Sequence, residues 1–212
     1  MTNDQQDFNI LSIDVDFCKD EKSFRDIVRL FTDIISKRCS STHKQLPNIS
    51  FSQTHSDILS CISGRSLVSI YNIDDHHDIY YEPEDMIGFE DGVVCESNWV
   101  GWTMRSGFLN EYHWIKNRSS ELLPQQDLLS LQSHSLSYGK FNSNILKDGR
   151  AEQERSIYFY NSICDAKLRE KSFAEVFICM SPEYLNKDFH YLYFLLIDLA
   201  EDFLGKDSFK IF

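Results

Sequence analysis

Long hydrophobic runs are absent from this sequence: no stretch of apolar residues approaches the ~20 in succession that a membrane-spanning helix requires. The opening residues, MTNDQQD, lack the basic segment that begins a secretory signal peptide. Internal repeats, linkers and low-complexity segments are missing as well. These absences predict a cytoplasmic protein, without a membrane partner, in which residues 1–212 form a single domain.

Cysteine pairs with the C-x-x-C spacing typical of zinc sites and redox motifs are also absent. The six cysteines are scattered along the chain, at Cys18, Cys39, Cys61, Cys95, Cys164 and Cys179. Because several of them lie in apolar surroundings, this usage favours reduced core thiols over a disulfide framework or a zinc cluster.

Basic residues are scarce relative to acidic ones, with 21 Lys and Arg against 33 Asp and Glu and a formal net charge of −12. A protein with this charge repels phosphate backbones and anionic lipid surfaces. The balance therefore argues against nucleic acid and membranes as main partners, whereas a cationic substrate would be attracted.

Hydrophobic patterning predicts strands and helices that alternate along the chain. Strands are expected over residues 9–17, 48–55, 66–73, 156–160 and 173–180, and helices over residues 20–38, 57–62, 95–116 and 190–203. An acidic loop is expected over residues 79–94, and a short helix over residues 127–131. Such alternation, in a chain with 42% apolar residues, indicates an α/β domain with a mostly parallel sheet.

Ionisable side chains follow the third predicted strand without interruption: Asp74, Asp75, His76, His77 and Asp78. Since side chains alternate along an extended segment, Asp74, His76 and Asp78 project to one side and the other two project to the opposite side. Five such groups directly after a buried strand are costly without partners. Two carboxylates and an imidazole on one side therefore predict a metal centre at the end of this strand.

Further candidate ligands follow two other predicted strands: Asp14 and Asp16, in a D-x-D arrangement, and His55. Because parallel α/β sheets bind ligands beyond the carboxyl ends of their strands, these side chains are expected to meet those of the third strand. Four carboxylates and two imidazoles exceed what one divalent ion requires, and the oxygen-rich set favours two Mn²⁺ over a structural zinc. Two such ions ~3.5–4 Å apart lower the pKa of a shared water, which implies a hydrolytic reaction.

The motifs resemble those of a known superfamily. Residues 54–59 (THSDIL), followed by the D-x-H-x-D of residues 74–78, resemble the arginase and agmatinase pattern in which a strand-end histidine precedes D-x-H-x-D. The D-x-D of residues 14–16 is similar to another strand of these ureohydrolases, although in common arginases that strand comes later. Residues 96–99 and 177–184 are similar to segments of the smaller family that includes the peptide arginases. The resemblance implies a three-layer α/β/α fold, arginase/deacetylase-like and permuted or reduced.

The same resemblance implies a ligand set and a substrate. One manganese would be held by Asp74, Asp78, His55 and Asp14 and a second by His76, Asp74, Asp14 and Asp16, with Asp74 and Asp14 bridging. Peptide arginases convert arginine side chains of a ribosomally made precursor peptide to ornithine, with release of urea. An arginine-containing precursor peptide would then be the partner of this chain.

Substrate contacts and proton transfer are matched less directly. Arginases orient the guanidinium with an acidic residue at the end of a later strand, and here that strand ends at Met180 and Ser181 without a carboxylate. The resemblance leaves as substrate-binding candidates Glu96, Asn98, Trp99 and Glu183, and as catalytic candidates Asp78, His77 and His113.

Three other interpretations stay open. Asp75, His76 and His77 spell the D-H-H triplet that one class of manganese phosphoesterases pairs with an early D-x-D, but no basic cluster or glycine-rich phosphate loop follows. A zinc-dependent amide deacetylase on the same fold is disfavoured because the additional carboxylates indicate a second ion. The chain could also be a peptide-binding scaffold without catalytic activity.

Overall fold

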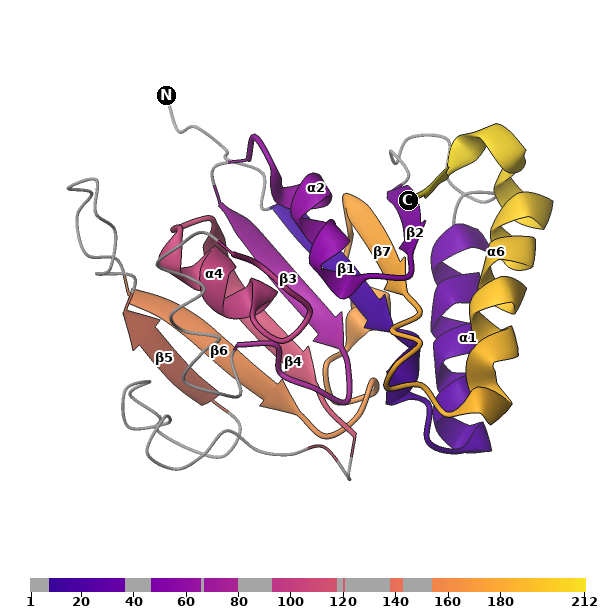
Figure 1. Cartoon of the computed structure of the whole chain (residues 1–212), viewed down its shortest axis with the longest axis horizontal. Helices are drawn as coiled ribbons and strands as arrows, with labels where there is room; N and C mark the ends of the chain where they lie inside the picture. Colours follow the sequence, from indigo (N-terminus) through magenta and orange to yellow (C-terminus); the bar gives the residue numbers. More distant parts are fainter. Residues whose placement is uncertain are drawn as a thin grey trace.

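The computed structural model describes residues 8–36, 47–65, 67–79, 93–117, 120, 138–142 and 154–212. Within these ranges the chain forms one eight-stranded sheet with the order β5-β6-β4-β3-β1-β7-β2-β8 (Figure 1). The strands are β1 (Phe8–Asp14), β2 (Asn48–Ser52), β3 (Val68–Ile73), β4 (Leu109–Ile115), β5 (Tyr138–Asn142), β6 (Glu154–Tyr160), β7 (Glu175–Cys179) and β8 (Lys210–Ile211). Every neighbouring pair is parallel except β5 with β6. The predicted α/β architecture with a mostly parallel sheet is therefore confirmed.

The first strand of the chain lies in the middle of the sheet, between β3 and β7, and β2 follows on the far side of β7. The register aligns Ile13 with Ile73 on one side and with Ile178 on the other, and Ile178 in turn with Phe51. These four strands therefore end at one edge of the sheet. Segments that are far apart in the sequence meet there.

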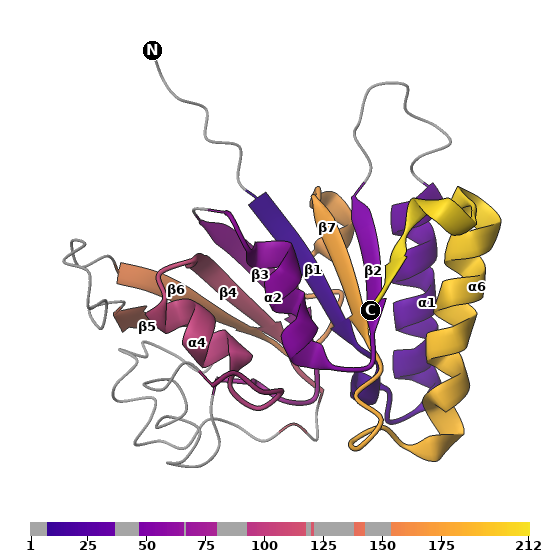
Figure 2. The ribbon, with the colours of Figure 1, turned by 45° about the horizontal axis from the view of Figure 1, so that its top comes forward.

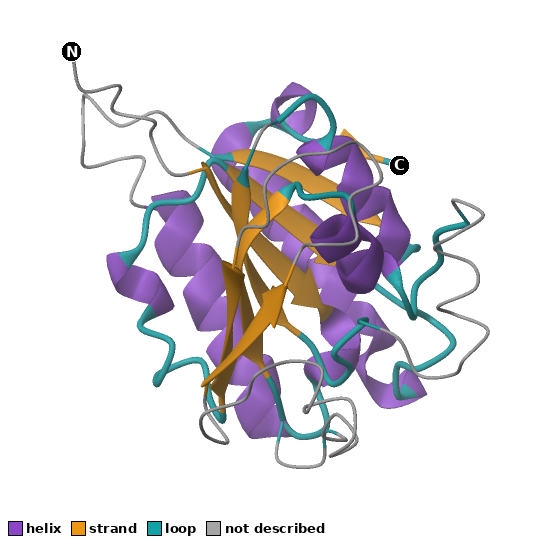
Figure 3. Cartoon of the chain, turned by 90° about the vertical axis from the view of Figure 1, so that its left-hand side faces the viewer, coloured by secondary structure: helices purple, strands orange, loops and turns teal. Residues whose placement is uncertain are grey.

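Helices cover both faces of the sheet, which gives the molecule three layers (Figure 3). Helices α1 (Glu21–Ser36) and α6 (His190–Leu204) lie side by side on one face. Helices α2 (Leu59–Ile62) and α4 (Trp99–Arg105) lie on the other face (Figure 2).

The central strands are buried on both sides, so they divide the core into two parts. In β1, Leu11 and Ile13 join the hydrophobic cluster beneath α1 and α6, whereas Ile10 joins the cluster that includes residues of α2 and α4. This alternation follows from the period of two in a strand. Polar side chains of these strands must consequently find partners inside the molecule, and Ser12, Asp14 and Asn72 do so at the carboxyl edge.

The predicted helix over residues 95–116 is wrong beyond Arg105, where α4 ends and β4 follows. Gly107 adopts a left-handed backbone with φ of 74°, which turns the chain out of the helix. The next segment pairs with β3 on one edge and β6 on the other, and it buries Tyr112 and Trp114 completely. Hydrogen bonding to two neighbouring strands therefore stabilised a strand in this segment, although the spacing of its aromatic residues suggested a helix.

Two other predictions fall on segments that the structure does not describe. Most of the acidic loop predicted over residues 79–94 and the short helix predicted over 127–131 lie outside the described residues. The five cysteines in the described ranges are free thiols, as predicted, and Cys39 lies outside them. Among the helices that the structure describes, none has the length and apolar character needed to cross a membrane.

Candidate metal centre

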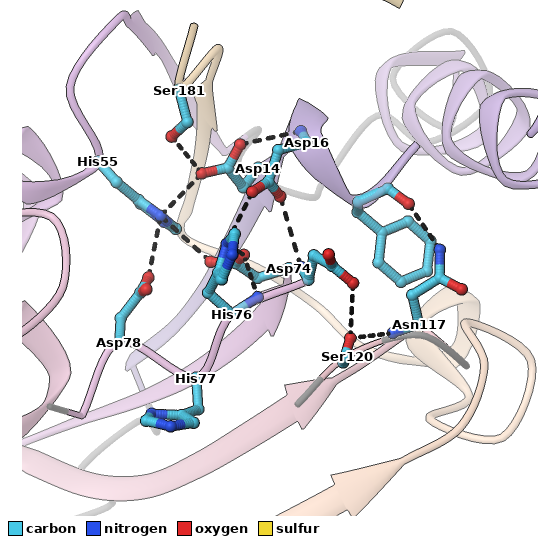
Figure 4. Close-up of polar contacts among 12 residues, drawn as sticks. Asp14, Asp16, His55, Asp74, His76, His77, Asp78, Asn117, Ser120 and Ser181 are labelled. Carbon is cyan, nitrogen blue, oxygen red and sulfur yellow. Dashed lines mark hydrogen bonds and ion pairs between the residues drawn. The ribbon is translucent and has the colours of Figure 1, made fainter. Parts of the chain in front are cut away.

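The edge where β1, β2, β3 and β7 end carries a cluster of carboxylates and imidazoles (Figure 4). Asp14 is the last residue of β1 and caps the short helix η1 (Val15–Phe17), because its Oδ1 accepts a 3.0 Å hydrogen bond from the backbone N–H of Asp16. After β2, the Ser52 hydroxyl caps the turn by accepting from the Thr54 N–H at 3.1 Å, and this turn delivers His55 to the edge. Local capping thus fixes where each ligand candidate emerges.

One group of the cluster is built around His55. Its Nδ1 lies 3.1 Å from Asp14 Oδ2, 3.2 Å from Asp74 Oδ2 and 3.1 Å from Asp78 Oδ2. All four residues are buried. A ring nitrogen carries at most one proton, so it cannot satisfy three buried carboxylates by itself. The arrangement fits a cation held among one imidazole nitrogen and three carboxylate oxygens.

The orientation of the His55 ring is fixed by a hydrogen bond on the side away from the carboxylates. Its Nε2 lies 2.8 Å from the Ser12 hydroxyl, which leaves Nδ1 turned toward the carboxylates. Ser181, at the end of β7, donates its hydroxyl proton to Asp14 Oδ2. Such outer hydrogen bonds orient ligands and fix ring tautomers at metal sites. The geometry around His55 is therefore imposed by the fold.

A second group is built around His76. Its Nδ1 lies 2.8 Å from Asp16 Oδ2 and 3.8 Å from Asp74 Oδ1. Asp16 Oδ2 is fully buried and, despite this short approach, accepts no properly oriented hydrogen bond from the part of the chain that the structure describes. A buried carboxylate oxygen whose close partner is one partly exposed imidazole is costly, and a second cation would satisfy it.

Asp74 joins the two groups because its two oxygens face different imidazoles, Oδ2 toward His55 and Oδ1 toward His76. Its carboxylate is fixed by the Asn72 amide, which donates to Oδ2 at 3.0 Å, and by the His76 backbone N–H, which donates to Oδ1 at 2.8 Å. Trp114 Nε1 donates to its backbone carbonyl at 3.0 Å. Asp74 thus has the position of a bridging ligand, whereas the contacts of Asp14 place it in the His55 group alone.

Burial and mutual repulsion shape the protonation of the cluster. Burial raises the pKa of Asp74 well above its usual value, and Asp78, Asp16 and Asp14 raise it further. Burial and the charge of Asp14 raise the pKa of Asp16 to about 6. Burial alone would lower the pKa of His55, but hydrogen bonds to three carboxylates raise it well above its usual value. The metal-free cluster therefore retains protons that a divalent ion would replace.

The other two members of the charged run point away from the cluster, as predicted, although residues 74–78 form a bend after β3 and not a continued strand. The Asp75 carboxylate pairs with Lys19 Nζ at 2.9 Å and accepts from the Ser120 hydroxyl at 2.9 Å. The His77 ring packs edge-on against Trp114, 5.7 Å away, and its Nδ1 accepts from the Ile79 N–H. Figure 4 shows the His77 ring directed away from the carboxylates. The structure does not bring this predicted proton shuttle into the cluster.

His113 is also separate from the cluster. It lies within β4, with its ring stacked between Tyr71 and Tyr158 at centroid distances of 4.0 and 4.5 Å. Its nitrogens contact Glu111 Oε2 and the Tyr160 hydroxyl, both at 3.1 Å. These contacts give His113 a place in a polar and aromatic ladder on the sheet, so the geometry does not support a proton-transfer role.

The predicted substrate-binding residues divide into two sets. Asn98 and Trp99 are buried, and the Asn98 side chain braces its own turn by accepting from the Cys95 N–H and donating to the Val93 carbonyl. Glu96 is half-buried, and its carboxyl interacts electrostatically with His55, Glu183 and Asp78. Only the glutamates therefore remain available to a substrate.

Three residues of the site escaped the sequence prediction: Ser12, Asn72 and Ser181. The first two stand two positions before Asp14 and Asp74, and so share their faces of β1 and β3, and the register pairs Ser12 with Asn72. The same period-two rule that selected the aspartates could have selected these two supports. Ser181 carried no such signal, because only the pairing of β7 with β1 brings it to Asp14.

Comparison with known proteins adds no identification. No protein-family model matches the chain, and no curated protein or solved structure is significantly similar to it. Buried groups that can hold metal ions are thus established by geometry alone, through Asp14, His55, Asp74 and Asp78.

Proposed function

We propose that this protein is a metal-dependent hydrolase that converts arginine side chains of a ribosomally made precursor peptide to ornithine, with release of urea. The observation that carries the proposal is the convergence of three buried carboxylates on His55 Nδ1, with one of them, Asp74, shared with a second imidazole. Two Mn²⁺ ions suit this mixed oxygen and nitrogen set better than a structural zinc, which prefers thiolates.

A pair of divalent ions, when bound, supplies a water of lowered pKa and positive charge next to the reacting carbon. The chain's own residues would hold the two ions in place. Asp74 would hold both ions, and its two oxygens are kept in place by different donors, the Asn72 amide and the His76 backbone N–H. Ser12 and Ser181 hold His55 and Asp14 in the orientation that ligation requires.

The opening of the cluster suits a planar cation. The Tyr184 side chain is 51% exposed and its ring lies 5.1 Å from the His76 ring, nearly edge-on. Burial raises the pKa of Tyr184, as do the nearby carboxylates of Glu96 and Glu183. A guanidinium stays charged at neutral pH, pairs with carboxylates and stacks on aromatic faces. We assign Glu96 and Tyr184 to the guanidinium, with Glu183 at the rim.

Proton transfer to the departing amine is assigned to Asp78. Hydrolysis adds water across the guanidinium carbon, breaks its bond to the side-chain nitrogen, and requires one proton on that nitrogen as it leaves. Asp78 belongs to the cluster, whereas His77 and His113 contact other residues. Burial raises the pKa of Asp78, but the hydrogen bonds from His55 and Trp99 and the charge of His55 together hold it below its usual value, so its proton would be transient.

The phosphoesterase interpretation loses support from the orientation of the D-H-H triplet. Only His76 of the triplet lies in the cluster, because Asp75 pairs with Lys19 and the His77 ring packs on Trp114. An anionic phosphate would also meet a protein of net charge −12. The guanidinium therefore remains the better match to the site.

Mass spectrometry tests the proposal directly. An arginine-containing peptide and free arginine are each incubated with manganese-loaded protein, beside an Asp74→Ala control. We expect the peptide to lose CH₂N₂ per converted arginine, to release urea stoichiometrically, and to remain unchanged with the control. Unchanged masses for both substrates, with two bound ions confirmed, would contradict the arginase assignment and favour the deacetylase interpretation.

A further inference from the structure

Trp99 hydrogen-bonds one carboxylate of the candidate metal centre from inside the core. The side chain is completely buried, so a substrate cannot reach it, yet its Nε1–H donates to Asp78 Oδ2 at 2.7 Å. The same oxygen lies 3.1 Å from His55 Nδ1. The indole ring also packs against the His55 ring at a centroid distance of 4.9 Å. Trp99 therefore touches two proposed ligands of the first ion at once.

The backbone of Asp78 needs such support. Its φ of 52° lies in the left-handed region, which is unfavourable for a residue other than glycine. The carbonyl of Asp78 accepts a 3.0 Å hydrogen bond from the Val100 N–H, at the start of α4. Two neighbouring residues of α4 thus hold the two ends of Asp78, its carbonyl and its carboxylate.

We propose that Trp99 is a positioning residue of the His55 group: its indole N–H aims the Asp78 carboxylate at the ion position and thereby raises the affinity of that position. This inference rests on the metal centre of the proposed function and extends it to the helix that follows the site. An indole N–H is a donor only, so it can orient a carboxylate without competing for the ion. Apolar packing alone would not require that donor.

The inference also links the ion position to the opening of the site. Trp99 directly follows the turn that the Asn98 side chain braces and that carries Glu96. Asp78 is therefore connected through Trp99 to the short segment that positions Glu96. Loss of the indole donor should weaken metal binding first and substrate binding second.

The test measures Mn²⁺ binding by titration calorimetry and by electron paramagnetic resonance in wild type, Trp99→Phe, Trp99→His and Trp102→Phe. Trp102 is the matched control, because it lies in the same helix and its ring stacks on Phe108, 5.9 Å away. We expect Trp99→Phe to weaken the tighter ion by about 10–100-fold, as loss of an outer hydrogen bond to a ligand does. Trp102→Phe should bind as the wild type does.

Trp99→His separates the donor from the packing. Histidine keeps a ring N–H but fills less volume, so a donor role predicts tighter binding in Trp99→His than in Trp99→Phe, and a packing role predicts the reverse order. In an Asp78→Asn background, Trp99→Phe should cause no further loss, because the two residues act through one contact.

Equal ion affinity in wild type and Trp99→Phe, or the reversed order of the two Trp99 variants, would overturn the inference and leave the metal centre intact. Absence of any bound ion in the wild type would overturn the metal centre itself, and this inference with it. Ion binding without turnover of a guanidinium would overturn the proposed substrate but not the role of Trp99.

Discussion

The group around His55 and the group around His76 share Asp74 but differ in depth and support. The His55 side chain is 2% exposed and faces three carboxylates at nearly equal distances, whereas the His76 side chain is 33% exposed and has one close carboxylate and one at 3.8 Å. The hydrogen bond between Ser12 and His55 and the one that Trp99 donates to Asp78 support the first group. The fold thus preorganises the His55 group more completely than the His76 group, and under the proposed function the His76 group would be the one that exchanges its ion and meets substrate.

The largest expected effect comes from removing the residue that the two groups share. Asp74→Asn should prevent binding of both ions and lower turnover of an arginine peptide by about 10³-fold or more, since ion chemistry supplies several kcal/mol. Metal content by elemental analysis and a urea assay measure the two losses. Asp75→Asn is the matched control, because that carboxylate pairs with Lys19 outside the cluster. Two tightly bound ions in Asp74→Asn would show that Asp74 does not bridge.

Separate removal of each imidazole should distinguish the two groups. In metal-free protein, His55→Ala leaves three buried carboxylates without their cation and should lower the free energy of unfolding by about 3–5 kcal/mol. His76→Ala removes a partly exposed partner and should cost at most about 1 kcal/mol. Urea unfolding monitored by circular dichroism gives both values. Similar losses in the two variants would contradict the difference in preorganisation.

The pH dependence of metal stabilisation should follow from the raised pKa values. Asp16 changes from 3.8 in the unfolded chain to about 6 in the folded, metal-free protein, and the pKa of Asp74 is also raised. The folded protein then binds protons that the unfolded chain has released, so the metal-free protein loses stability as pH rises from about 4 through about 6. A bound ion replaces those protons.

We therefore expect Mn²⁺ to raise Tm little at about pH 5 and considerably more at about pH 7.5, where the proton on Asp16 no longer competes with the ion. Differential scanning fluorimetry with and without the ion measures this difference. Asp16→Asn should flatten its pH dependence. A rise in Tm that is the same at both pH values would indicate that the ion does not bind at the buried carboxylates.

The smallest expected effect concerns the open side of the cluster. Tyr184→Ala should raise KM for an arginine peptide by about 2–5-fold, the value of one exposed cation–π contact, and leave kcat and metal content unchanged. Tyr191→Ala is the matched control, because this tyrosine is similarly exposed, at 55%, and packs against Phe24 on the side of α1. Equal KM values in the two variants would remove Tyr184 from the substrate site.

Residue types and the alternation of side chains along a strand predicted most of the candidate ligands and the kind of sheet. The sequence predicted which side chains of the run 74–78 face together, and the structure places Asp74, His76 and Asp78 with the other ligand candidates. Alternation of strands and helices predicted the parallel sheet. Both predictions depend on local chain geometry, which propagates reliably over short segments.

Contacts between distant segments were harder to predict. The aromatic run after Trp99 suggested one helix. Its second half instead forms β4, because it pairs with β3 on one side and with β6 on the other. Trp99 was expected to meet a substrate and instead orients Asp78 from within the core. Nothing in the local sequence indicates which strand will lie next to which, so these roles could not be assigned beforehand.

The sequence by itself determined the chemistry that this protein carries: acidic and imidazole side chains at strand ends, an α/β core to hold them, and an excess of acidic over basic groups. Only the tertiary structure decided how these groups share space. The order of β3, β1, β7 and β2 sets Asp74, Asp14, Ser181 and His55 side by side. Because these carboxylates are buried, the charge of each one affects the protonation of the others. Charges removed from water must be satisfied by one another or by a cation.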